Sequence, residues 1–127
     1  MSASQARIVL STAGREQEAR SIARRLVDER LAACVNIVGP IRSVYRWRGA
    51  VEEEPEFLLL IKTRASLLRR LERRLIESHS YEVPEMLAFA PGAGSAAYLG
   101  WLLESTVSKP ARGETRAARG RGGRNRK

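Results

Sequence analysis

The chain has 127 residues, of which 43% are hydrophobic and 29% are charged, a length and composition that predict one globular domain with a modest core. Its single cysteine, Cys34, excludes a disulfide within the chain and favours a reducing compartment. No apolar run is long enough for a signal peptide core or a membrane span. We therefore expect a cytoplasmic protein with no membrane partner.

The formal net charge of +9 is concentrated near the C-terminus. Residues 109–127 contain eight basic residues, one acid and no apolar side chain larger than alanine. Such a segment cannot bury enough surface to offset its ordering entropy. We predict a folded domain over residues 1–106 and a disordered Arg/Gly-rich tail over residues 107–127. The tail could contact nucleic-acid phosphates weakly, or could serve only to keep the protein soluble.

The first part of the chain alternates strand and helix patterns. The apolar run at residues 7–13 predicts a buried strand. Apolar residues then recur at helical spacing over residues 19–27, and Ser11-Thr12 offers hydroxyl groups to cap that helix. Residues 32–38 predict a second strand, which Gly39-Pro40 interrupts as a bulge or a bend.

The middle of the chain predicts a long hairpin. Residues 41–48 alternate strictly, which places Tyr45 and Trp47 together on one face of a strand. Gly49 marks the turn, and residues 57–63 form the buried part of the returning strand. The hairpin extends beyond the reach of two helices, so its aromatic face implies cover from another chain and therefore a homo-oligomer.

The remaining elements complete the fold prediction. Residues 66–78 have helical spacing of leucines, residues 84–90 read as a strand, and residues 91–94 form a loop before a short helix that Ser95 caps. The order βαββαβ plus a C-terminal helix predicts an α+β protein, a ferredoxin-like split βαβ sandwich with a long β-hairpin.

Three motifs have a structural interpretation beside a chemical one. Cys34 lies between apolar neighbours, which favours an inert buried thiol over a reactive one. The segment PGAGS at residues 91–95 could offer backbone N–H groups to an anion, but it has no P-loop lysine and reads as a turn. Residues 52–54 are three glutamates whose side chains alternate in a strand, so pairing with the hairpin arginines is favoured over cation binding.

The stretch ESHSYEVPE at residues 77–85 contains the only histidine of the chain. The stretch can be a simple turn from a helix to a strand. In that interpretation His79 bonds to the terminal carbonyls of the helix, and Pro84 starts the strand. A turn does not require Tyr81 or Glu82, which leaves a functional role open. One histidine needs further ligands for a metal, and no nucleophile–base pair is visible, so we expect no enzyme.

Five segments, taken together, are distinctive. They are ERLAACVNI (29–37), SVYRWRGAVEE (43–53), LLLIKT (58–63), SHSYEVPEML (78–87) and YLGWL (98–102). In order and spacing, over about residues 7–105, they resemble the CutA family of divalent-cation tolerance proteins. The resemblance implies a homotrimer in which the long hairpins of neighbouring subunits pair. It also implies a cytoplasmic role in tolerance to copper and other divalent ions, with no established catalytic activity.

The resemblance also carries site residues. Some members bind copper through a cysteine in the first strand and two adjacent histidines, and the matching positions here hold Ser11 and Ser78-His79. Where the family usually has His-Pro-Tyr, this chain has Ser80 in place of the proline. We predict that a divalent metal ion, copper or zinc, would use His79, Glu82 and Cys34.

A cleft between subunits is the second predicted site. The residues that we assign to this intersubunit cleft are Tyr45, Trp47, Lys62, Tyr81 and Glu85. An alternative hypothesis is a trimeric regulatory scaffold whose cleft binds a small anion or metabolite through Arg46, Arg48 and Lys62.

Overall fold

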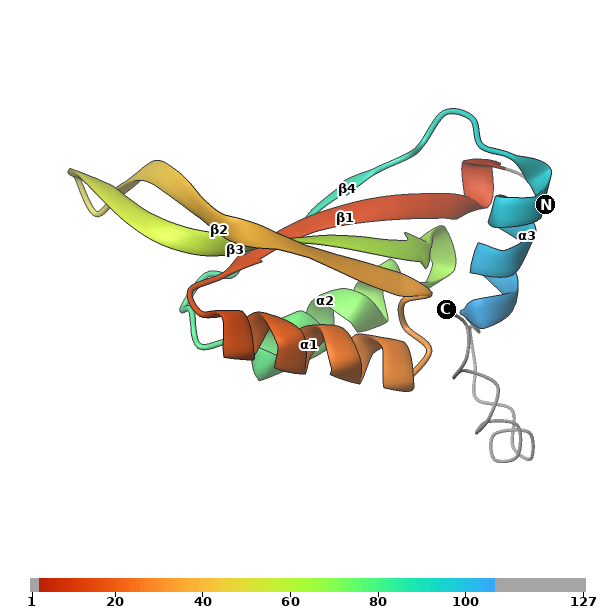
Figure 1. Ribbon diagram of the computed structural model, residues 1–127, viewed down its shortest axis with the longest axis horizontal. Helices are drawn as coiled ribbons and strands as arrows, with labels where there is room; N and C mark the ends of the chain where they lie inside the picture. Colours follow the sequence, from red (N-terminus) through yellow and green to blue (C-terminus); the bar gives the residue numbers. More distant parts are fainter. Residues whose placement is uncertain (1–2, 107–127) are drawn as a thin grey trace.

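A computed structural model describes residues 3–106; the predicted tail, residues 107–127, lies outside the described residues. The elements follow the predicted order (Figure 1). They are η1 (Ala3–Gln5), β1 (Ala6–Ala13), α1 (Glu16–Asp28), β2 (Cys34–Trp47), β3 (Ala50–Arg64), η2 (Ala65–Leu67), α2 (Leu68–Ser78), β4 (Leu87–Phe89) and α3 (Ala96–Ser105). The α+β class and the split βαβ order are confirmed.

The four strands form one antiparallel sheet in the order β2-β3-β1-β4. All of β1 pairs with β3, from Ala6 opposite Arg64 to Ala13 opposite Phe57. The last strand is shorter than the predicted residues 84–90, because only Leu87–Phe89 pair with β1. The residues before it form a loop instead.

The β2–β3 hairpin projects beyond the helices, as Figure 1 shows. Its two strands are continuous apart from one register shift between Val38 and Ile41, which confirms the bulge predicted at Gly39-Pro40. A Cβ atom on Gly39 would lie 2.6 Å from the ring of Phe57, so no larger residue fits there without movement. At the tip, Gly49 has φ of +84°, a conformation that glycine adopts without strain.

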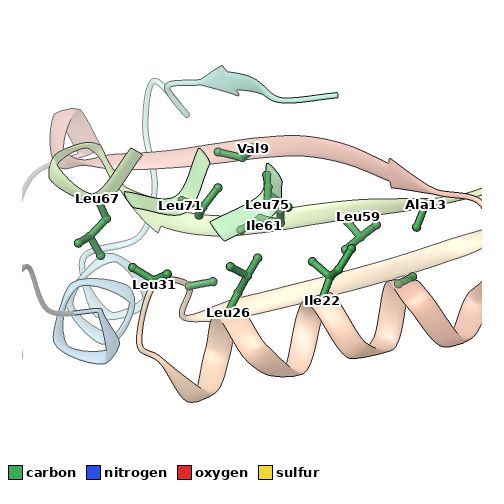
Figure 2. Close-up of a cluster of buried hydrophobic side chains, with 12 residues drawn as sticks. Val9, Ala13, Ile22, Leu26, Leu31, Leu59, Ile61, Leu67, Leu71 and Leu75 are labelled. Carbon is green, nitrogen blue, oxygen red and sulfur yellow. The ribbon is translucent and has the colours of Figure 1, made fainter. Parts of the chain in front are cut away.

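The main core lies between the sheet and the two helices α1 and α2, which cover the same face (Figures 1 and 2). The apolar spacing of α1 buries Ala19, Ile22 and Leu26, as predicted, because these residues repeat once per turn on one side. Val27, predicted to belong to that face, is exposed instead. A smaller cluster packs α3 against the end of the sheet through residues that include Leu99 and Leu102.

The helix caps differ in part from the prediction. Ser11-Thr12 lies inside β1 and does not cap α1, whose N-cap residue, Arg15, makes no side-chain capping bond. These two residues instead continue β1, where Ser11 lies opposite Leu59 and Thr12 opposite Leu58 of β3. Ser95 does cap α3, and its Oγ accepts a bond from the Tyr98 N–H at 3.2 Å. Within the described part of the chain, no helix is long and apolar enough to cross a membrane.

Candidate functional site

A pocket of about 690 Å³ lies between the β2–β3 hairpin and the loop that follows α2. Residues 80–85 form one wall, and the hairpin supplies the other wall through Ser43, Tyr45, Trp47 and Glu56. The side chains at 43, 45 and 47 share one face because strand residues alternate, which confirms the predicted alternation. This volume falls in the range typical of small-molecule sites.

Tyr81 and Glu56 connect the two walls. The Tyr81 hydroxyl donates to Glu56 Oε2 at 2.6 Å, although the two residues are 25 positions apart. Glu56 is only 8% exposed, and burial together with this bond raises the pKa of Tyr81, so the phenol stays protonated and remains a donor. The bond is charge-assisted and partly buried, which makes it stronger than an ordinary surface contact.

Negative charge is concentrated on this side of the pocket. Burial, and next the carboxylate of Glu56, raise the pKa of Glu85, while a hydrogen bond from Thr12 opposes the shift. Glu56 and Glu85 both line the pocket, and a positive group beside the two carboxyl groups would be stabilised. The pocket is therefore suited to a cationic ligand.

His79 lies behind the loop wall with a fully buried side chain. Its Nδ1 accepts a hydrogen bond from the Tyr81 N–H at 3.1 Å, which assigns the ring proton to Nε2. Nε2–H then donates to the Thr12 carbonyl oxygen at 2.6 Å. Both ring nitrogens are thus used in these two bonds, so His79 anchors the loop to β1 and has no lone pair left for a metal.

Ser80 anchors the same loop to α1. Its backbone N–H donates to Glu18 Oε2 at 2.7 Å, and its hydroxyl donates to Glu18 Oε1 at 3.0 Å. Proline, which the family resemblance places at this position, has no N–H and could make neither bond. The serine therefore has a definite structural role in this chain.

Arg48 bridges the tip of the hairpin and the loop. Its Nη2 donates to Glu82 Oε1 at 2.8 Å, and its guanidinium lies 5.1 Å from the centre of the Trp47 ring. Glu82, a predicted metal ligand, is therefore an ion-pair partner. The predicted pairing of hairpin arginines with the glutamates at 52–54 is confirmed for one pair, in which Arg42 Nε lies 3.6 Å from Glu53 Oε2.

Two further residues of the predicted sites, Cys34 at the start of β2 and Lys62 opposite it on β3, lie far from the tip of the hairpin. Cys34 is half-buried, not fully buried as expected, because it opens the outer strand of the sheet on the face that neither α1 nor α2 covers. It pairs in register with Lys62, whose ammonium group binds Asn36. Lys62 is therefore outside the pocket that contains the other four predicted cleft residues.

The predicted metal ligands do not meet in one protomer. Lys62, opposite Cys34, pairs with Ile8, whereas His79 contacts Thr12, four residues or roughly 13 Å farther along β1. Among residues 3–106, no three His, Cys, Asp or Glu side chains converge on a common point. The residues of one protomer do not fit a preformed metal centre, and the ligand assignment stays a prediction.

Sequence reasoning missed three residues of the site. Glu56 belongs to the acidic stretch of the hairpin, and nothing in that pattern distinguishes it from Glu52 and Glu54. It lies opposite Ile41, close to the buried part of β3. The hydroxyl of Thr12 predicts a helix cap, and nothing in the local pattern indicates the position of this residue in the pocket wall. Glu18 lies in the first turn of α1, and nothing in the local pattern indicates its bonds to Ser80.

Comparison with known proteins agrees with this geometry. The family described as "CutA1 divalent ion tolerance protein" matches residues 7–105. The "Divalent-cation tolerance protein CutA" of Thermus thermophilus is 48% identical over 99 residues, which cover 78% of this chain and 96% of that protein. "Protein CutA, chloroplastic" of Arabidopsis thaliana is 46% identical over 99 residues, or 78% of this chain but only 54% of that longer protein.

Solved structures show the same fold. The crystal structure of CutA1 from Oryza sativa superposes with a TM-score of 0.80 at 41% identity, covering 83% of this chain and 96% of that one. With residues 7–105 matched and a relative 48% identical across nearly its whole length, the chain belongs to the CutA1 divalent ion tolerance protein family.

Proposed function

We propose that the protein is a homotrimeric divalent-cation tolerance protein of the cytoplasm, which acts by binding and not by catalysis. The observation that carries the proposal is the face of the sheet that α1 and α2 leave uncovered. On that face the acidic, aromatic pocket adjoins an apolar surface suited to self-association. The single free cysteine supports a reducing compartment such as the cytoplasm. The Arabidopsis relative is chloroplastic, so the location of this protein has to be measured directly.

The uncovered face is apolar along several strands. Register places Ile8 opposite Phe89, and it places Leu10 between Leu60 and Leu87, so all five side chains share this face. Leu87 and Phe89 are exposed in the single chain. An apolar patch of this kind on a small protein marks an interface. Further copies of this chain, seated on this patch, would remove its apolar side chains from water.

Self-association is tested with a matched pair of substitutions. Leu87, on the sheet face, is 55% exposed, and Ile76, on the outer side of α2, is 56% exposed. We expect light scattering of the full chain to give a trimer for the parent protein and for Ile76→Arg, and a smaller species for Leu87→Arg. A trimer of Leu87→Arg as stable to dilution as the parent trimer would refute this interface.

Metal binding would have to use groups of more than one protomer, because one protomer provides no preformed centre. The carboxylates Glu56 and Glu85 line the pocket beside the uncovered face of the sheet, and carboxylate oxygens are among the ligands that Zn²⁺ accepts. Calorimetric titration with Cu²⁺ and Zn²⁺ tests this. We expect saturable binding that Glu85→Gln weakens and that Glu53→Gln leaves unchanged. Heat that does not saturate would remove metal binding from the proposal.

The alternative with an anionic ligand has no comparable support. Arg48 is already paired with Glu82, and Lys62 lies outside the pocket. Within residues 3–106, the pocket is lined by three glutamates and by no lysine or arginine. Nucleic-acid contact through the tail concerns residues outside the described part of the chain and stays a prediction.

A further inference from the structure

The pocket between the hairpin and residues 80–85 is far larger than an ion requires. A divalent cation sits about 2 to 2.6 Å from its ligands, whereas this pocket measures about 690 Å³. Its lining combines aromatic rings, Tyr45, Trp47 and Tyr81, with the apolar side chains of Val83 and Pro84. Rings and apolar groups of this kind contact the body of an organic molecule and offer little to a bare ion.

The charge of the lining selects the sign of that molecule. Glu56, Glu82 and Glu85 line the pocket, and among its lining residues within 3–106 there is no basic side chain. Arg48 neutralises Glu82 from outside, which leaves Glu56 and Glu85 facing the pocket without a cation. Burial, and next the nearby Glu56 carboxylate, raise the pKa of Glu85, and a positive ligand beside both side chains would oppose this shift.

The chain itself shows how this surface holds a cation. The guanidinium of Arg48 lies 5.1 Å from the centre of the Trp47 ring and donates to Glu82 at 2.8 Å, so one carboxylate and one ring share it. A second combination of a carboxylate with aromatic rings lies in the buried part of the pocket, where Glu56 lies beside Tyr81 and Tyr45. No side chain of residues 3–106 supplies the cation for this second combination.

Glu56 gives the second combination its hydrogen-bonding specificity. Tyr81 donates to Oε2, one of the two oxygens of this carboxylate. A carboxylate that is more than nine-tenths buried is stabilised strongly by a partner that is both charged and a donor. A primary ammonium group meets both requirements, and a flat apolar body attached to it would lie against the aromatic rings.

We infer that this pocket binds an organic cation, a primary ammonium group on a flat apolar body, with Glu56 as its anchor and Tyr45, Trp47 and Tyr81 as its walls. This ligand class goes beyond the divalent-cation role and does not depend on it. The ammonium group would lie at Glu56 and Glu85, and the body would extend toward Trp47 at the open end of the hairpin.

The test uses the full chain carrying Trp101→Phe, so that Trp47 is the only tryptophan. Titrations are followed by tryptophan fluorescence, in the presence of EDTA so that metal binding plays no part. The probes are 2-phenylethylammonium, the neutral 2-phenylethanol and the anionic 3-phenylpropionate. We expect a saturable change for the ammonium probe, with an affinity about tenfold or more above that of the alcohol and no binding of the carboxylate.

Variants locate the anchor. Glu56→Gln is expected to weaken 2-phenylethylammonium binding about ten- to a hundredfold, because it removes the charge that pairs with the ammonium group. Glu53→Gln is the matched control, since it removes the same charge from the same strand on the opposite face. Glu85→Gln serves as a second variant if Glu56→Gln does not fold, as judged by circular dichroism, and should weaken binding in the same direction.

Three results would overturn the inference. They are equal affinity for the ammonium probe and the alcohol, no binding of any probe, and equal loss in Glu53→Gln and Glu56→Gln. Failure of the copper and zinc titrations would leave these results unaffected, so the two proposals fail separately.

Discussion

Replacing His79 by alanine tests whether this residue anchors the loop. The substitution removes the bond to the Thr12 carbonyl and the bond from the Tyr81 N–H, both in a region where the His79 side chain is fully buried. Each backbone group left without a partner costs about 1–3 kcal/mol. We therefore expect His79→Ala to lower the free energy of unfolding by about 2–5 kcal/mol.

The measurement is urea denaturation followed by circular dichroism, at one fixed protein concentration because self-association adds to apparent stability. His79→Gln keeps an amide N–H near the position of Nε2 and should recover about 1 kcal/mol. Val83→Ala, a truncation of an exposed side chain in the same loop, should change stability by less than about 0.5 kcal/mol. A loss below about 1 kcal/mol in His79→Ala would refute the anchoring role.

The anchoring role also affects the design of metal-binding experiments. If His79→Ala loosens the loop, residues 80–85 move with it, and any site that includes Glu82 or Glu85 is disturbed indirectly. His79→Gln is the better variant for metal titrations, because it removes the imidazole and keeps one of its bonds. A direct ligand and an anchor are then distinguishable.

Three further predictions concern pH and packing. The pKa of Glu85 is raised in the folded state, so the folded protein binds this proton more tightly than the unfolded chain does, and the contribution is lost as pH rises from 4.5 through the folded value. Glu85→Gln should therefore be more stable than the parent at pH 7, an advantage that fades toward pH 4 in paired urea titrations. Gly39→Ala should cost about 1–3 kcal/mol in the same assay, because its Cβ would lie 2.6 Å from the Phe57 ring; no loss would show that the bulge adjusts freely. Leu71→Ala, which empties part of the core beneath the sheet, should cost about 2–5 kcal/mol, and a smaller loss would mean that the core collapses around the gap.

Much of the fold follows from local pattern. The leucines of α2 and the alternation of residues 41–48 depend only on spacing, and spacing is visible in one dimension. Likewise, Ser95 caps a helix that starts at the next residue, and Gly39-Pro40 marks a bulge at its own position. The order of the elements then restricts the topology, since one split βαβ arrangement accommodates it. For these features the sequence by itself was sufficient.

The tertiary structure alone decided how the site is built. His79 meets Thr12 across 67 positions, Ser80 meets Glu18 across 62, and Arg48 meets Glu82 across 34. Each contact depends on how far the loop folds back over the sheet, and no periodicity encodes that distance. The burial of Glu56 likewise depends on the arrival of Tyr81 from a distant loop. Periodicity fixes which face of an element a residue occupies, whereas the packing of separate elements decides which partner it meets and which of its atoms remain free for a ligand.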